Sequence, residues 1–84
     1  MKSADAALFD ALRAVAAETF HCKPEEIVEA TVADDIPGWD SLSYTVFIMR
    51  LEETFDVEFD VAELSRFARV GDLFSTLVEK KRNR

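Results

Sequence analysis

Glycine and proline are nearly absent from this chain, and their scarcity limits what it can fold into. Only two of each occur among 84 residues: Pro24, Pro37, Gly38 and Gly71. Between them, apolar residues recur three and four positions apart, the spacing that places side chains on one face of an α-helix. Strand-like alternation is confined to residues 56–59, which is too short to build a sheet. The pattern therefore predicts an all-α fold.

The apolar spacing predicts four helices within a single domain that covers residues 1–84. We expect three longer helices over 3–20, 41–55 and 70–80, and a short one over 60–67. The helix over 41–55 is the best defined, because Asp40 is a good N-cap and one apolar face runs along its length. That face consists of Tyr44, Phe47, Ile48, Leu51 and Phe55. Such helices pack into a four-helix bundle, with residues 21–40 as a long connection in which Pro24 begins a single helical turn.

Charge and length exclude several classes of function. Seventeen acidic against ten basic residues give a net charge of −7, which repels nucleic acid and anionic membrane surfaces. No apolar run reaches the roughly 20 residues that span a bilayer, and the first residues lack an apolar signal core. A chain this short forms no deep cleft of its own, which favours a module that works on a partner over an enzyme. We therefore expect a cytoplasmic monomer without nucleic-acid binding or membrane insertion.

The single cysteine and the single histidine narrow the chemistry further. Cys22 has no second cysteine with which to form an internal disulfide or a cysteine metal cluster. A single histidine, His21, cannot form the usual zinc sites, which need several histidines. We expect Cys22 to have a structural role and His21 to lie at a helix end. No metal is predicted, and the domain must hold together by packing.

Ser41 is the residue that stands out as a candidate site. It follows Asp40 at the start of a predicted helix, where backbone N–H groups without partners and the helix dipole stabilise an attached phosphate. Hydrolysis by Ser41 would need a general base, and His21 lies outside any nucleophile-elbow pattern. Ser41 is therefore interpreted as a residue that another enzyme modifies, with no catalytic residue in the chain.

Five short motifs together resemble the acyl carrier proteins. The tripeptide Asp40-Ser41-Leu42 matches the family's modified serine with its two neighbours. Further matches lie on both sides of it, at residues 23–27, 32–36, 51–55 and 70–73, so that the resemblance extends from about residue 5 to 79. It implies the family's four-helix fold.

The resemblance also implies a function. Ser41 would receive a 4'-phosphopantetheine arm from coenzyme A through a phosphopantetheinyl transferase, and the arm would carry acyl groups as thioesters. Expected partners are acyl-loading and acyl-processing enzymes with basic docking patches, in fatty-acid, polyketide or specialised lipid biosynthesis. The carrier itself would perform no catalysis.

A second stripe on the helix over 41–55 is the candidate surface for these partners. In the family this helix is the recognition helix, and the matching positions here are Leu42, Val46, Met49, Glu52 and Glu53. Residues 25–60 contain eleven acids against the single base Arg50, a balance that steers basic partners. The alternative is that the three apolar residues of the stripe pack beneath the 21–40 connection.

Two positions differ from the commonest family pattern. Ser43 and Val46 stand where members of fatty-acid synthesis usually have acids, which favours a specialised carrier. Two other functions remain open: a peptidyl or aminoacyl carrier, and an acidic helical interaction domain in which Asp40-Ser41 only caps a helix. Aromatic side chains in the core either line an acyl cleft or fill it, and filling favours short, polar or exposed cargo.

Overall fold

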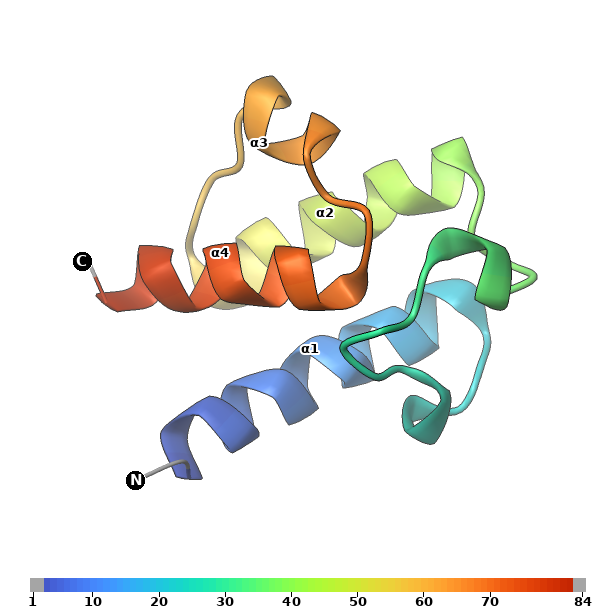
Figure 1. Cartoon of the computed structure of the whole chain (residues 1–84), viewed down its shortest axis with the longest axis horizontal. Helices are drawn as coiled ribbons and strands as arrows, with labels where there is room; N and C mark the ends of the chain where they lie inside the picture. Colours follow the sequence, from blue (N-terminus) through green and yellow to red (C-terminus); the bar gives the residue numbers. More distant parts are fainter. Residues whose placement is uncertain (1–2, 83–84) are drawn as a thin grey trace.

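The computed structural model describes residues 3–82, which form four α-helices and two single turns of 3-10 helix. The α-helices are α1 (Ser3–Phe20), α2 (Ser41–Phe55), α3 (Val61–Ser65) and α4 (Val70–Arg82). The turns η1 (Pro24–Glu26) and η2 (Ala33–Asp35) lie in the connection between α1 and α2. No strand occurs between residues 3 and 82. The predicted all-α bundle of three longer helices and one short helix is confirmed (Figure 1).

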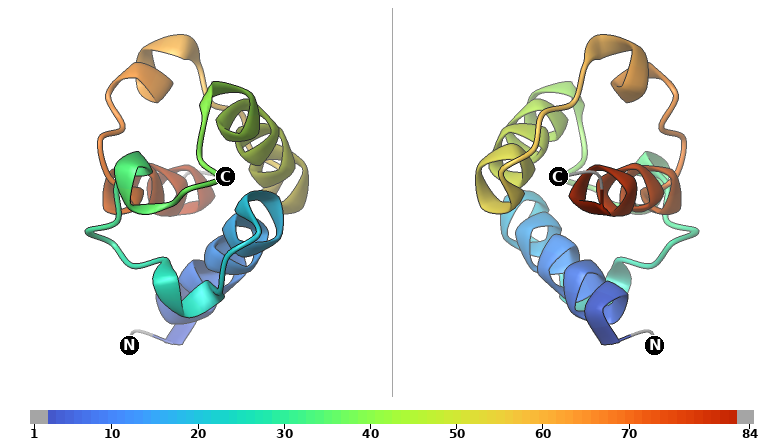
Figure 2. Two further views of the ribbon diagram at one scale, coloured as in Figure 1. Left: turned by 90° about the vertical axis from the view of Figure 1, so that its right-hand side faces the viewer. Right: turned by 90° about the vertical axis from the view of Figure 1, so that its left-hand side faces the viewer.

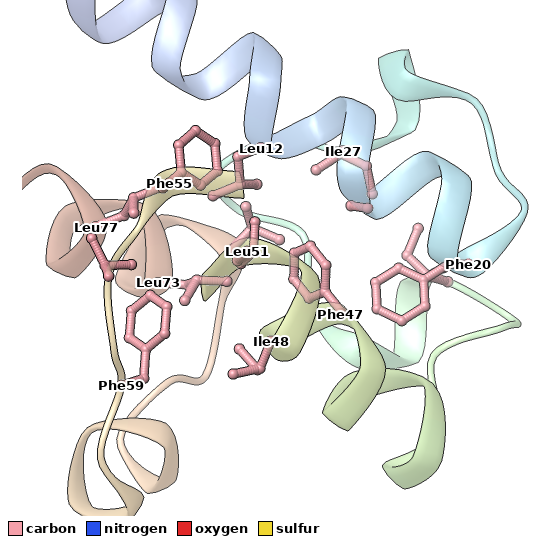
Figure 3. Packing of buried hydrophobic residues seen from close by; sticks show 14 residues of the cluster. Leu12, Phe20, Ile27, Phe47, Ile48, Leu51, Phe55, Phe59, Leu73 and Leu77 are labelled. Atoms are coloured by element: carbon pink, nitrogen blue, oxygen red, sulfur yellow. The ribbon is translucent and has the colours of Figure 1, made fainter. Parts of the chain in front are cut away.

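The three longer helices surround a common core (Figure 2). Helix α1 contacts both α2 and α4, and α3 lies apart from α1 on the other side of the bundle (Figure 1). Phe47 and Leu51 of α2 and Leu12 of α1 are completely buried, together with Leu77 of α4. Figure 3 shows their side chains converging between the helices. Burial of this apolar surface is the main force that holds the domain together.

The helix bounds differ from the sequence prediction at two places. Helix α3 covers Val61–Ser65 rather than 60–67, because the N–H groups of Ala68 and Arg69 turn to the carboxylate of Asp72, each at 3.0 Å. Those bonds begin α4 and prevent α3 from continuing. Helix α4 continues to Arg82 rather than ending at residue 80, because basic residues in its last turn favour the negative end of the helix dipole.

Helices α1 and α2 end without glycine. His21 after α1 has a φ of 58°, and Asp56 after α2 has a φ of 56°. This left-handed conformation reverses the chain at a helix end and is usually occupied by glycine. The expectation that His21 marks a helix end is thus confirmed.

Backbone hydrogen bonds tie the long connection to α4. The buried Thr31 accepts a hydrogen bond from the N–H of Val28 at 2.9 Å, and its carbonyl accepts one from the N–H of Val70 at 2.9 Å. The carbonyl of Glu29 accepts a further bond from Gly71 at 2.8 Å. The middle of the connection is therefore fixed against the start of α4.

Residues 3–82 contain neither a membrane-spanning helix nor a cluster of metal-ligating side chains. None of the helices within 3–82 is long and apolar enough to cross a membrane. Over the same range, no group of three or more His, Cys, Asp or Glu side chains is placed to hold a metal ion.

Candidate functional site

Ser41 is the first residue of α2 and is exposed. The helix begins there because Asp40 has an extended backbone and its Oδ1 accepts a hydrogen bond from the N–H of Ser43 at 2.8 Å. This bond is the main reason that the pKa of Asp40 lies below its ordinary value, so that its carboxylate stays ionised. Asp40 therefore holds the start of α2, and the hydroxyl of Ser41 is left accessible to a second molecule.

The loop before Ser41 is held by aromatic stacking. The ring of Trp39 stacks on Phe20, the last residue of α1, with centroids 4.8 Å apart and planes only 6° from parallel. The ring of Trp39 also stacks on Tyr44 of α2, with centroids 5.8 Å apart and planes 16° from parallel. The N–H of Trp39 also donates to the carbonyl of Ile36 at 3.0 Å. These contacts fix the chain on both sides of the short segment that carries Ser41.

A shallow groove lies beside Ser41. It is lined by Ala33, Trp39, Asp40, Ser41 and Tyr44. The groove offers two hydroxyls, one carboxylate and two aromatic side chains, and His21 is not among its lining residues. Because no histidine lines the groove and Oδ1 of Asp40 is bonded to the N–H of Ser43, this arrangement suits attachment of a group to Ser41 better than nucleophilic catalysis by Ser41.

Tyr44 belongs to this groove, which sequence reasoning missed. The helical period assigned Tyr44 to the core stripe of α2, but it is only half-buried, and partial burial raises its pKa. The other four members of that stripe are buried as predicted: Phe47, Ile48, Leu51 and Phe55. The available signal was the spacing, because a residue three positions after Ser41 lies one helical turn below it.

Most of the candidate partner surface is exposed. Leu42, Met49 and Val46 expose 76 %, 58 % and 37 % of their surface, so the alternative that the 21–40 connection covers them is wrong. Glu53 is exposed as well. Glu52 differs, because it is half-buried and its carboxylate accepts a hydrogen bond from the N–H of Phe59 at 3.0 Å. Glu52 thus ties the segment after α2 back to that helix.

Cys22 is half-buried and packs against the core. Its burial, and in second place the negative charge of Glu26, raise the pKa of its thiol. A raised pKa leaves little reactive thiolate at neutral pH, which agrees with the structural role expected for this residue.

The chain matches known proteins that carry phosphopantetheine. The family model "Phosphopantetheine attachment site" matches residues 10–77, which places the chain in the class of phosphopantetheine-dependent carriers. Acyl carrier protein from Wolinella succinogenes is 36 % identical over 67 residues, covering 80 % of this chain and 88 % of the relative. Acyl carrier protein from Syntrophobacter fumaroxidans is 42 % identical over 53 residues, covering 63 % and 64 %.

Similarity in structure agrees with similarity in sequence. The solution NMR structure of holo acyl carrier protein from Geobacter metallireducens superimposes with a TM-score of 0.83 at 30 % identity, covering 99 % of this chain and 90 % of that one. The chain belongs to the acyl carrier protein family. Its prosthetic group is 4'-phosphopantetheine, and members of the family are carriers rather than catalysts that act with a phosphopantetheinyl transferase and acyl-processing enzymes. This membership favours a carrier over the interaction domain considered above.

Proposed function

We propose that Ser41 is the residue to which 4'-phosphopantetheine is attached. The observation that carries the proposal is the exposure of Ser41 at the first position of α2, next to the groove that contains Asp40 and Trp39. A phosphodiester there lies at the positive end of a 15-residue helix. The polar and aromatic lining of the groove suits an arm with a phosphate at one end and amide and methyl groups along its length.

Attachment forms one bond and breaks another. The Oγ of Ser41 attacks the pantetheine phosphorus of coenzyme A, the pyrophosphate bond breaks, and adenosine 3',5'-bisphosphate leaves while the hydroxyl proton passes to a base of the transferase. This chain supplies the hydroxyl and its fixed position, and Asp40 holds that position through Ser43. When bound, the arm supplies a terminal thiol that carries the acyl group as a thioester.

The test is intact mass spectrometry after incubation with coenzyme A and a broad-specificity phosphopantetheinyl transferase. We expect the wild-type chain to gain one phosphopantetheine and the Ser41→Ala variant to gain none. Ser43→Ala is the matched control, since it removes a hydroxyl two residues away on the same helix, and it should still gain the arm. An unmodified wild type, or a modified Ser41→Ala variant, would contradict the assignment.

We further propose that Leu42, Val46, Met49 and Glu53 form the docking surface for partner enzymes, with Glu52 as its acidic rim. Three exposed apolar side chains next to acids are typical of a transient interface in which charge steers a basic partner. The surface continues from Ser41 along α2, so that a docked enzyme would reach the arm. The carrier is proposed to act in this way as a cytoplasmic monomer.

A further inference from the structure

A second, very small pocket lies directly behind the groove at Ser41. Trp39 and Tyr44 line both, and the pocket is also lined by the apolar residues Phe67, Ala68, Val70 and Leu73. Its volume is about 20 Å³, close to the space that one water molecule needs. An acyl chain that entered the bundle between Trp39 and Tyr44 would meet this pocket, which has no room for several methylene groups.

Aromatic rings fill the space that such a chain would occupy. Trp39 lies between Phe20 and Tyr44 in one continuous stack. The ring of Phe47 contacts both rings from inside the core, with its centroid 6.2 Å from that of Trp39 and 5.2 Å from that of Phe20. Below them Val70 and Leu73 expose only 1 % and 2 % of their surface. The stack therefore closes the bundle from the Ser41 side.

The backbone next to Trp39 packs closely against the end of α1. The neighbouring residue Gly38 packs against Phe20 so closely that a Cβ on it would stand 2.6 Å from the Phe20 carbonyl oxygen. Trp39 is thus held against the end of α1 through both its ring and the preceding peptide. Entry of an acyl chain would require the stack to part and the loop to move with it.

We propose that Trp39 keeps the acyl group of this carrier outside the helical core, so that its cargo is short or polar. The proposal rests on the attachment proposed for Ser41. An aliphatic chain that cannot be buried stays in water, which is unfavourable in proportion to its apolar area. A short or polar acyl group has little such area. Trp39 acts here as a positioning residue that selects cargo by closing the pocket.

The test compares the chain loaded with an acetyl and with an octanoyl group, each transferred to Ser41 as acyl-phosphopantetheine from the corresponding coenzyme A. Intact mass first verifies loading, and a chain that gains no mass contradicts the attachment at Ser41 itself, and with it this inference. For the loaded wild type we expect the two Tm values to agree within about 1 °C. Trp39 is the only tryptophan in the chain, and its emission maximum should be the same in both forms.

Two outcomes would overturn the proposal. One is a Tm of the octanoyl form more than about 4 °C above that of the acetyl form, together with a shifted Trp39 emission, since a buried chain stabilises the fold. The other is a Trp39→Ala variant, or Trp39→Leu if the alanine variant does not fold, whose Tm does not change on octanoylation, because the proposal requires octanoylation to raise the Tm of this variant by more than about 4 °C. Tyr44→Phe keeps the ring and should behave like the wild type. An equal response of wild type and Trp39 variant would remove the role assigned to Trp39.

Discussion

Gly38 and Phe20 touch backbone to backbone: a Cβ on Gly38 would stand 2.6 Å from the carbonyl oxygen of Phe20 and 3.3 Å from its carbonyl carbon. This contact joins the end of α1 to the loop that precedes Ser41. Side chains repeat the connection one residue later, where Trp39 stacks on the ring of Phe20. The position of Ser41, the proposed attachment residue, is therefore set by the end of α1 as well as by the cap of α2.

The first prediction follows from that contact. Gly38→Ala places a methyl group where the Phe20 carbonyl stands, and we expect it to lower the free energy of unfolding by about 1–3 kcal/mol. Urea denaturation followed by circular dichroism measures the change. The control is Gly71→Ala. Its Cβ would lie 3.0 Å from the carbonyl oxygen of Glu29, but the substitution also raises the helix propensity of a position within α4. A larger loss at Gly71 than at Gly38 would contradict the argument.

The helices could be predicted from the sequence because their signals are local. Asp40 as cap and the apolar spacing after it were enough to place α2 at 41–55, as found. The end of α3 was not predictable in this way. It depends on whether the N–H groups of Ala68 and Arg69 bond to the helix before them or to Asp72 after them, and both patterns are compatible with the same residues.

The site was predictable only in part, for a similar reason. Ser41 could be proposed as the site from its motif, but the closure of the pocket behind it depends on Phe20, Trp39 and Tyr44, which come from three different segments. Contacts between distant segments leave no periodic signal in one sequence. The tie from Thr31 to Val70 was missed for the same reason.

The second prediction separates Ser41, the residue proposed to be modified, from Asp40, which caps the helix that carries it. Ser41→Ala should change the free energy of unfolding by less than about 0.5 kcal/mol, because the side chain of Ser41 is exposed and does not pack in the core. Asp40→Ala should lower the urea midpoint, because it removes the acceptor of the Ser43 N–H. A loss well above about 1 kcal/mol in Ser41→Ala would show that the serine is structural.

The third prediction concerns acid. Backbone N–H groups at helix starts donate to the carboxylates of Asp40, Glu63 and Asp72, and these bonds are the main reason that the pKa of each lies below its ordinary value. Each carboxyl group has a lower pKa in the folded chain than in the unfolded chain. It therefore stabilises the fold at pH values above its unfolded-state pKa, and this stabilisation is lost as the pH falls through its folded-state pKa. With unfolded values of 3.8 for Asp and 4.5 for Glu, stability should decline below about pH 4.5.

Urea unfolding at a series of pH values from 7 to 2.5 measures this decline. Asp40→Asn tests the part that Asp40 contributes, because asparagine also caps helices but carries no charge. The variant should lose less stability than the wild type between pH 5 and pH 2.5. Identical pH profiles would show that the charge of Asp40 contributes nothing.

The fourth prediction uses the two thiols of the modified protein. Because burial and Glu26 raise the pKa of Cys22, we expect iodoacetamide at pH 7.5 to alkylate the chain without the arm more slowly than free cysteine. In the modified chain the first alkylation should fall on the arm, as read by mass spectrometry of peptides. The Cys22→Ser variant that carries the arm should likewise be alkylated first on the arm. Rapid labelling of Cys22 in the unmodified chain would contradict its buried, structural role.

The fifth prediction tests the proposed docking surface on α2. Val46→Asp adds a negative charge at a position that is 37 % exposed, and at low salt it should lower the KM of a phosphopantetheinyl transferase with a basic docking patch by about 2- to 5-fold, the size of one exposed ion pair. Added salt should remove the gain, because ions screen exposed charges. Thermal unfolding first verifies that the variant is folded.

Val28→Asp is the matched control for this fifth prediction. It makes the same substitution at another exposed valine, which lies in the connection between α1 and α2 rather than on α2. Its KM should stay close to that of the wild type, because steering depends on where the added charge lies and not only on net charge. If both variants lower the KM equally, the effect belongs to the overall charge of the carrier. If neither does, Val46 lies outside the surface that the transferase contacts.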